Sequence, residues 1–216
     1  MHSKRQINFL SVEKFRRKLK GLWRLETSWL LSLSLLVFLA TVGCSSAEKF
    51  DPSTPEGAFK QAEELEKDER FEEAVAKYTD LKNKHPYSRY AVLAELKIAD
   101  VQFLRESFIE AQYAYQTFKD LHPKHPQIDY VTFRLGLSFF NQLPSTTDRD
   151  LSLADKAILY FDEVMSSYPS SPYVKEAGAK KAEAVRMQAD KELYIANFYF
   201  RKKQYVSALG RFETLL

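Results

Sequence analysis

The sequence is poor in cysteine, glycine and proline. Its 216 residues include one cysteine, six glycines and eight prolines. A single cysteine excludes an intramolecular disulfide framework and any metal site built from several cysteines. Scarce glycine and proline disfavour a turn-rich β fold, and with 45% hydrophobic and 28% charged residues the composition favours a helical globular protein.

Patterns that carry enzyme chemistry are also missing. Of the four histidines, only His122 and His125 stand at a spacing that could suit a metal, and Pro123 and Pro126 interrupt the helix that would align them. The sequence has no glycine-rich phosphate loop, and no Ser-His-acid arrangement can be argued from spacing. We therefore expect a protein that is not an enzyme and that needs neither metal nor cofactor.

Positive charge is concentrated at the N-terminus. Residues 1–43 hold eight of the 32 Lys and Arg and two of the 29 Asp and Glu, which leaves 24 basic and 27 acidic residues, a net charge of −3, from Cys44 onward. The body of the chain therefore gives no electrostatic reason to expect nucleic-acid binding.

The only cysteine, Cys44, ends an apolar run that follows a basic segment at residues 14–24. The strongly apolar part is about a dozen residues, which suits a signal peptide and falls short of the ~20 that a spanning helix needs. Small residues precede Cys44, and the chain after it is polar. The sequence TVGC at residues 41–44 resembles a bacterial lipoprotein signal. Two alternatives are a signal anchor and a buried cysteine without a special role.

The resemblance to a lipoprotein signal implies that residues 1–43 are removed and that Cys44 receives a lipid. Residues 44–54 show no apolar period and read as a flexible tether behind that anchor. Ser45, in place of the Asp that tends to retain lipoproteins at the inner membrane, implies transport to the outer membrane.

The rest of the chain, residues 55–216, repeats itself. Four segments each carry an alanine followed four residues later by an aromatic residue, which places both on one helix face. In the first three segments a proline follows the alanine by twelve residues and ends the helix. The pairs are Ala74/Tyr78, Ala111/Tyr115, Ala157/Phe161 and Ala208/Phe212, and the prolines are Pro86, Pro123 and Pro169.

Small residues also repeat on the helices between these segments. Ala62, Ala99 and Gly136 are 37 residues apart, whereas Ala111 and Ala157 are 46 apart. The nine extra residues predict a loop inserted near residues 144–152. Residues 173–203 contain few helix breakers and predict one long helix or two in close succession.

This pattern resembles the tetratricopeptide repeat, a helix-turn-helix unit that stacks into a superhelix. We expect about four units, the last of them incomplete. Ala208 predicts a proline at position 220, and no polar capping helix follows, so the expectation is an all-α superhelix truncated at its C-terminus. The alternative is a bundle of unrelated amphipathic helix pairs.

Longer stretches are more specific than the repeat itself. Residues 85–103, 122–140, 147–177 and 192–212 resemble the BamD family of lipoproteins. The resemblance implies a non-catalytic scaffold in the β-barrel assembly machine, lipid-anchored at the periplasmic face of the outer membrane of a Gram-negative bacterium. Its partners would be the POTRA domains of the barrel-forming assembly protein, other assembly lipoproteins and unfolded outer-membrane proteins, with docking mainly through the C-terminal repeats.

Other envelope proteins remain as alternatives. The chain could be the repeat domain of a peptidoglycan-cleaving lipoprotein, or of a factor associated with cell division.

A peptide groove is predicted on the first helices of the units. The 37-residue period places one set of residues toward a concave face, and aromatic anchors in a groove are a usual source of peptide affinity. Arg105 and Arg134 are near in register and could bind a terminal carboxylate. Aromatic residues at helical spacing can equally be core. The set is Phe59, Leu96, Phe103, Tyr130, Phe133 and Phe140.

Overall fold

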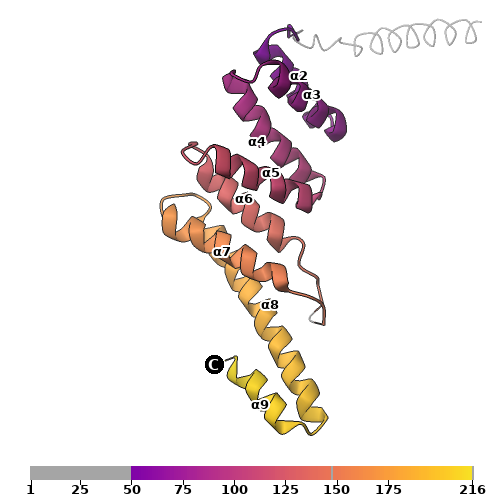
Figure 1. The fold of residues 1–216 in the computed structure, drawn as a ribbon, viewed down its shortest axis with the longest axis vertical. Helices are drawn as coiled ribbons and strands as arrows, with labels where there is room; N and C mark the ends of the chain where they lie inside the picture. The colour runs from indigo at the N-terminus through magenta and orange to yellow at the C-terminus, as the bar shows by residue number, and fades with distance from the viewer. Residues whose placement is uncertain (1–49, 147, 216) are drawn as a thin grey trace, which may run out of the picture. The chain divides into compact units, whose positions relative to one another are not determined.

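The computed structural model describes residues 50–146 and 148–215, and within them every regular element is a helix (Figure 1). The predicted signal peptide and Cys44 lie outside these residues. The helices are α2 (Pro55–Lys67), α3 (Phe71–Lys84), α4 (Arg89–Leu104), α5 (Phe108–Leu121), α6 (Ile128–Phe140), α7 (Ser152–Ser167), α8 (Val174–Arg201) and α9 (Tyr205–Glu213).

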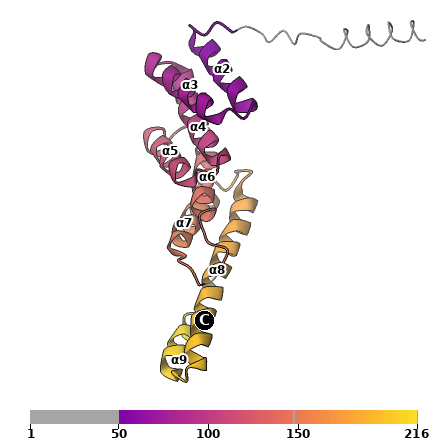
Figure 2. The same cartoon turned by 90° about the vertical axis from the view of Figure 1, so that its right-hand side faces the viewer.

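The helices form hairpins that follow one another along the chain (Figures 1 and 2). The hairpins are α2/α3, α4/α5, α6/α7 and α8/α9, and each helix packs mainly against its neighbours in sequence. Local packing of this kind is what repeat proteins show, because each unit buries its apolar face only against adjacent units. The predicted all-α stack of helix-turn-helix units is confirmed.

Helix starts and ends follow local sequence signals. Thr54 accepts a hydrogen bond from the Gly57 amide at 3.1 Å, with Pro55 in the first turn of α2, and the Ser88 hydroxyl accepts one from the Tyr90 amide at the start of α4. Side chains of this type satisfy amides that have no partner inside a helix. Helices α3, α5 and α7 end two residues before the proline of their segment, and the C-cap residue directly before each proline is His85, His122 or Tyr168.

The predicted alanine and aromatic pairs form the centre of the packing. Both members of the first three pairs, through Ala157 and Phe161, are fully buried, and Ala208 is 2% exposed. Its partner Phe212 is only half-buried. The three pairs therefore explain why the second helix of each of the first three units is held against its neighbours.

Small residues allow the first helices to approach closely. Ala62, Ala99 and Gly136 are all buried. A Cβ atom on Gly136 would come within 2.9 Å of the Phe161 ring, so this position needs glycine for packing and not for a special backbone conformation.

The turns inside the units are of two kinds. The hairpins α2/α3, α4/α5 and α8/α9 turn through a left-handed residue, Glu69, Glu106 or Lys203, with φ between 59° and 61°. In the third hairpin, residues 141–151 take the place of this turn, which confirms the predicted insertion. The long helix predicted for residues 173–203 is also confirmed, as the single 28-residue helix α8.

Candidate functional site

Three junctions between successive units place the same three positions together. One residue comes from the first helix of a unit, one from its second helix and a cation from the first helix of the next unit; the spacing of 37 residues rises to 46 across the inserted loop. The first junction is Glu66, Tyr78 and Lys97, the second is Phe103, Tyr115 and Arg134, and the third is Phe140, Phe161 and Lys180.

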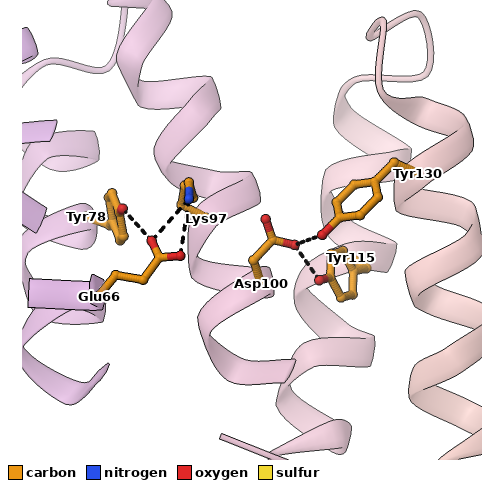
Figure 3. A network of polar contacts seen from close by, with 6 residues as sticks. All are labelled: Glu66, Tyr78, Lys97, Asp100, Tyr115 and Tyr130. Atoms are coloured by element: carbon orange, nitrogen blue, oxygen red, sulfur yellow. Dashed lines mark hydrogen bonds and ion pairs between the residues drawn. The ribbon is translucent and has the colours of Figure 1, made fainter. Parts of the chain in front are cut away.

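The first junction is a closed ion pair (Figure 3). The Lys97 Nζ atom lies 3.2 Å from both carboxylate oxygens of Glu66, and the Tyr78 hydroxyl donates to Glu66 Oε2 at 2.8 Å. The Glu66 side chain is only 16% accessible. Burial and the hydrogen bond to Glu66 raise the pKa of Tyr78, so this phenol remains a neutral donor.

At the second junction the tyrosine, Tyr115, donates its hydrogen bond to a different carboxylate, that of Asp100. Figure 3 shows Tyr115 and Tyr130 on the same side of Asp100 of α4, and their hydroxyls donate to its Oδ1 atom at 2.6 and 2.7 Å. Burial raises the pKa of Asp100, while the two tyrosines and the charges of Arg134 and Lys97 oppose that rise. Two donors and a nearby cation hold the carboxylate in place.

The Arg134 guanidinium is therefore held without a carboxylate partner. Its Nε atom donates to the Tyr115 hydroxyl at 3.1 Å, and its Cζ atom lies 3.6 Å from the centre of the Phe103 ring. Among the residues that the structure describes, no carboxylate lies within 4.0 Å of its nitrogens, and its two terminal nitrogens make no hydrogen bond. Stacking and one hydrogen bond fix the group, while its donors remain available to an anion.

The third junction repeats the cation over a ring. The Lys180 Nζ atom lies 4.5 Å from the centre of the Phe140 ring. It also pairs with Glu183 at 3.0 Å on the same helix, an exposed contact of a kind that contributes little. Phe161 stands where the first two junctions have tyrosine, so this junction lacks the hydroxyl.

The structure brings part of the predicted groove together. Phe103, Tyr130 and Arg134 are in contact, with the guanidinium 3.6 Å and 5.7 Å from the two ring centres. Phe140 lies at the next junction with Lys180. The four predicted residues, Phe103, Tyr130, Arg134 and Phe140, are partly accessible, so they can meet a ligand.

Three other groove residues were wrongly placed. Phe59, Leu96 and Phe133 are 8%, 4% and 3% exposed and belong to the core. They occupy one equivalent position, 37 residues apart, which faces inward in the first three units; Phe59 packs on Tyr78, and Phe133 stacks on Tyr173. Arg105 pairs with Glu72 of α3 at 3.0 Å and not with a group near Arg134.

The structure also has a cavity that was not predicted from the sequence. A cavity of about 550 Å³ lies between α3, α4 and α5. Its apolar lining includes Ile109, Tyr113 and Leu121, which are 69%, 75% and 62% exposed. The available signal was the pair Ile109 and Tyr113, apolar residues four apart on the outer side of α5.

His122 and His125 have structural partners. His122 lies 2.7 Å from the Glu95 carboxylate, and the rings of His122 and His125 both pack on Phe118. Within residues 50–146 and 148–215, no three His, Cys, Asp or Glu side chains are grouped as metal ligands would be. Over the same residues, no helix combines the length and apolarity required to cross a membrane.

Comparisons with known proteins agree with one another. A family model described as YfiO, outer membrane lipoprotein, matches residues 52–216. The outer membrane protein assembly factor BamD of Neisseria meningitidis serogroup A is 28% identical over 170 residues, which are 74% of this chain and 64% of that protein. The BamD of Vibrio cholerae is 25% identical over 198 residues, covering 87% of this chain and 80% of that protein.

The chain thus spans less than two thirds of the Neisseria relative. Among solved structures, a putative kinesin light chain with nearly identical TPR-like repeats from Podosopora anserina is 10% identical with a TM-score of 0.49, covering 97% of both chains.

Proposed function

Because the chain belongs to the YfiO family of outer membrane lipoproteins, we propose that it is a non-catalytic scaffold that recognises substrates during assembly and insertion of outer-membrane β-barrel proteins. The observation that carries this proposal is the family match, which covers nearly all described residues. The relatives quoted above are named as assembly factors, which does not favour a peptidoglycan-cleaving enzyme or a division factor.

The proposed location follows from the N-terminal sequence. Residues 1–43 would be a signal peptide, Cys44 the lipidated residue and residues 44–54 the tether. The position of the only thiol at the end of the apolar run supports this assignment. Several acyl chains on one residue would hold the protein firmly, at the periplasmic face of the outer membrane of a Gram-negative bacterium.

The proposed docking surface for the assembly machinery is the last hairpin. Helices α8 and α9 expose apolar side chains that include Phe198, Phe200, Tyr205, Val206 and Leu209, between 45% and 87% exposed. Clustered aromatic residues of this kind are common at protein interfaces. The partners would be the POTRA domains of the barrel-forming protein and other assembly lipoproteins.

The proposed substrate surface lies at the second and third junctions. Phe103, Tyr130, Arg134 and Phe140 are partly accessible and combine apolar rings with a fixed cation. This chemistry suits an extended segment of an unfolded barrel protein, which presents aromatic and charged side chains on alternate faces.

Depletion of the protein from its host tests the proposed function. Folded barrel proteins, scored by heat-modifiable gel mobility, should fall in the outer membrane, while unrelated lipoproteins keep their amounts. Unchanged barrel proteins together with altered cell-wall cleavage or septation would contradict the proposal.

A photoreactive residue tests the substrate surface separately. Placed at Phe103 it should crosslink to newly exported barrel proteins, whereas the same residue at Lys156, an exposed position on α7, should not. Equal crosslinking at both positions would remove the substrate surface from the proposal and leave the family role untouched.

A further inference from the structure

We propose that Arg134 and Lys180 form a site with two binding points, one at each cation, for the side-chain carboxylates of an extended acidic peptide segment. The proposal rests on the proposed function, since it names the chemistry of the segment that the substrate surface would bind. It is carried by the three equivalent junctions, which differ in how each cation is used.

The residue opposite each cation decides whether that cation is available. At the first junction the opposite residue is Glu66, and Lys97 is bound by both of its oxygens. At the second and third junctions Phe103 and Phe140 occupy the equivalent positions. A ring face attracts a cation without using its hydrogen-bond donors, so Arg134 is positioned without a carboxylate partner, while Lys180 has only the exposed pair with Glu183 on its own helix.

Arg134 is the better prepared of the two groups. Asp100 shares the Tyr115 hydroxyl with Arg134 and already accepts hydrogen bonds from both tyrosines. The guanidinium is immobilised by Phe103 and Tyr115, which reduces the ordering that binding would cost. Its planar fork suits a carboxylate held by two parallel hydrogen bonds.

Lys180 provides the second binding point. It occupies the position of Arg134 one unit further along, over the ring of Phe140. The side chains of Lys180 and Glu183 are 33% and 42% exposed. A carboxylate of the ligand can therefore replace Glu183 as the partner of Lys180 at little cost.

Two considerations favour a peptide over a larger polyanion. Arg134 is half-buried between α4 and α6, where a single side chain can enter more easily than a surface. An extended peptide also presents alternate side chains on one face, which suits two cations at equivalent positions of successive units.

Peptide binding to the full chain in detergent tests the proposal by fluorescence anisotropy. The probe is an extended peptide of about ten residues, long enough at ~3.3 Å per residue to cross neighbouring helices, with two Glu separated by one or by three residues. Its reference is the same peptide with both Glu replaced by Gln. The Glu peptide should bind about tenfold more tightly, and R134Q and K180Q should each reduce its affinity by about three- to fivefold.

The control variant is Lys156→Gln, which removes an exposed cation from α7 and should leave the affinity unchanged. Thermal melting of every variant keeps a folding defect separate from a binding defect. Raised salt should weaken the Glu peptide and leave the Gln peptide unaffected.

Three results would overturn the proposal. They are equal affinities for the Glu and Gln peptides, equal losses for K156Q and R134Q, and R134Q-sensitive binding to vesicles with anionic lipid in place of the peptide. Each of these would leave the barrel-assembly role standing if depletion still lowers folded barrel proteins. Conversely, acidic-peptide binding that depends on Arg134, with no effect of depletion on barrels, would refute the proposed function alone.

Discussion

The first and second junctions share a tyrosine and a cation at equivalent positions but use them differently. In the first, Tyr78 and Lys97 both bind the carboxylate of Glu66. In the second, Phe103 replaces the glutamate, Tyr115 turns to Asp100, and Arg134 binds the tyrosine oxygen and the phenylalanine ring. With a ring in place of the glutamate and arginine in place of lysine, the second junction holds its cation in position without the carboxylate partner that Lys97 has in the first.

The sharpest test of this difference compares the two cations by removing each. Lys97→Met should lower the free energy of unfolding by about 2 kcal/mol, because the nearly buried Glu66 carboxylate loses its partner. Arg134→Met should lower it by about 1 kcal/mol or less, because it removes a ring contact and one hydrogen bond to Tyr115, while both tyrosines still donate to Asp100. Urea denaturation measures both, and equal losses would mean that Arg134 is as structural as Lys97.

The hydroxyls give a second contrast, with the opposite order. Tyr115→Phe should cost about 2 kcal/mol, because this hydroxyl both donates to Asp100 and accepts from Arg134, whereas Tyr78→Phe should cost about 1 kcal/mol, because Lys97 still neutralises Glu66. Chemical denaturation of the two variants side by side checks this. A larger loss for Tyr78→Phe would contradict the assigned network.

The third junction extends the comparison to apolar packing. Gly136→Ala should lower the free energy of unfolding by about 1 kcal/mol or more, because its Cβ would lie 2.9 Å from the Phe161 ring. Gly178→Ala is the matched control, since its Cβ would meet only Met165 Sδ at 3.4 Å, and it should gain up to about 1 kcal/mol from helix propensity. Calorimetric melting of both distinguishes close packing from a general effect of glycine; stabilisation by both would refute the packing argument.

The smallest effect concerns the turns that precede the second helices. Glu106→Gly should raise the free energy of unfolding by about 0.5 kcal/mol, because glycine accepts the left-handed conformation at φ 59° more readily. Glu110→Gly, four residues further in α5, should lower it by about 1 kcal/mol. A loss at both positions, measured by thermal unfolding, would show that the turn is not strained.

Much of the fold could be predicted because small and aromatic residues recur at fixed spacings in each repeat. The alanine and aromatic pairs, the terminating prolines and the nine-residue insertion each leave a local signature, and all lie where spacing placed them. The rotation of the first helices did not follow in the same way. A 37-residue period shows that Phe59, Leu96 and Phe133 are equivalent, but it does not show whether their side chains point toward the core or toward solvent. In the structure all three are buried in the core.

The candidate site was predictable only in part for a related reason. Register predicted Arg134 and Phe103 on one face, and the structure has them in contact, but Asp100 depends on hydrogen-bond geometry between three helices. Lys180 was missed because the inserted loop shifts its spacing from 37 to 46 residues. Aligning the cations across that insertion would have found it.

The most direct test of the central claim is purification of the tagged full-length protein from its own membranes in mild detergent, followed by mass spectrometry. The proposed function predicts that a large β-barrel protein with POTRA domains co-purifies in stoichiometric amount. Recovery of cell-wall or division proteins in its place would contradict it and assign the scaffold to another system of the envelope.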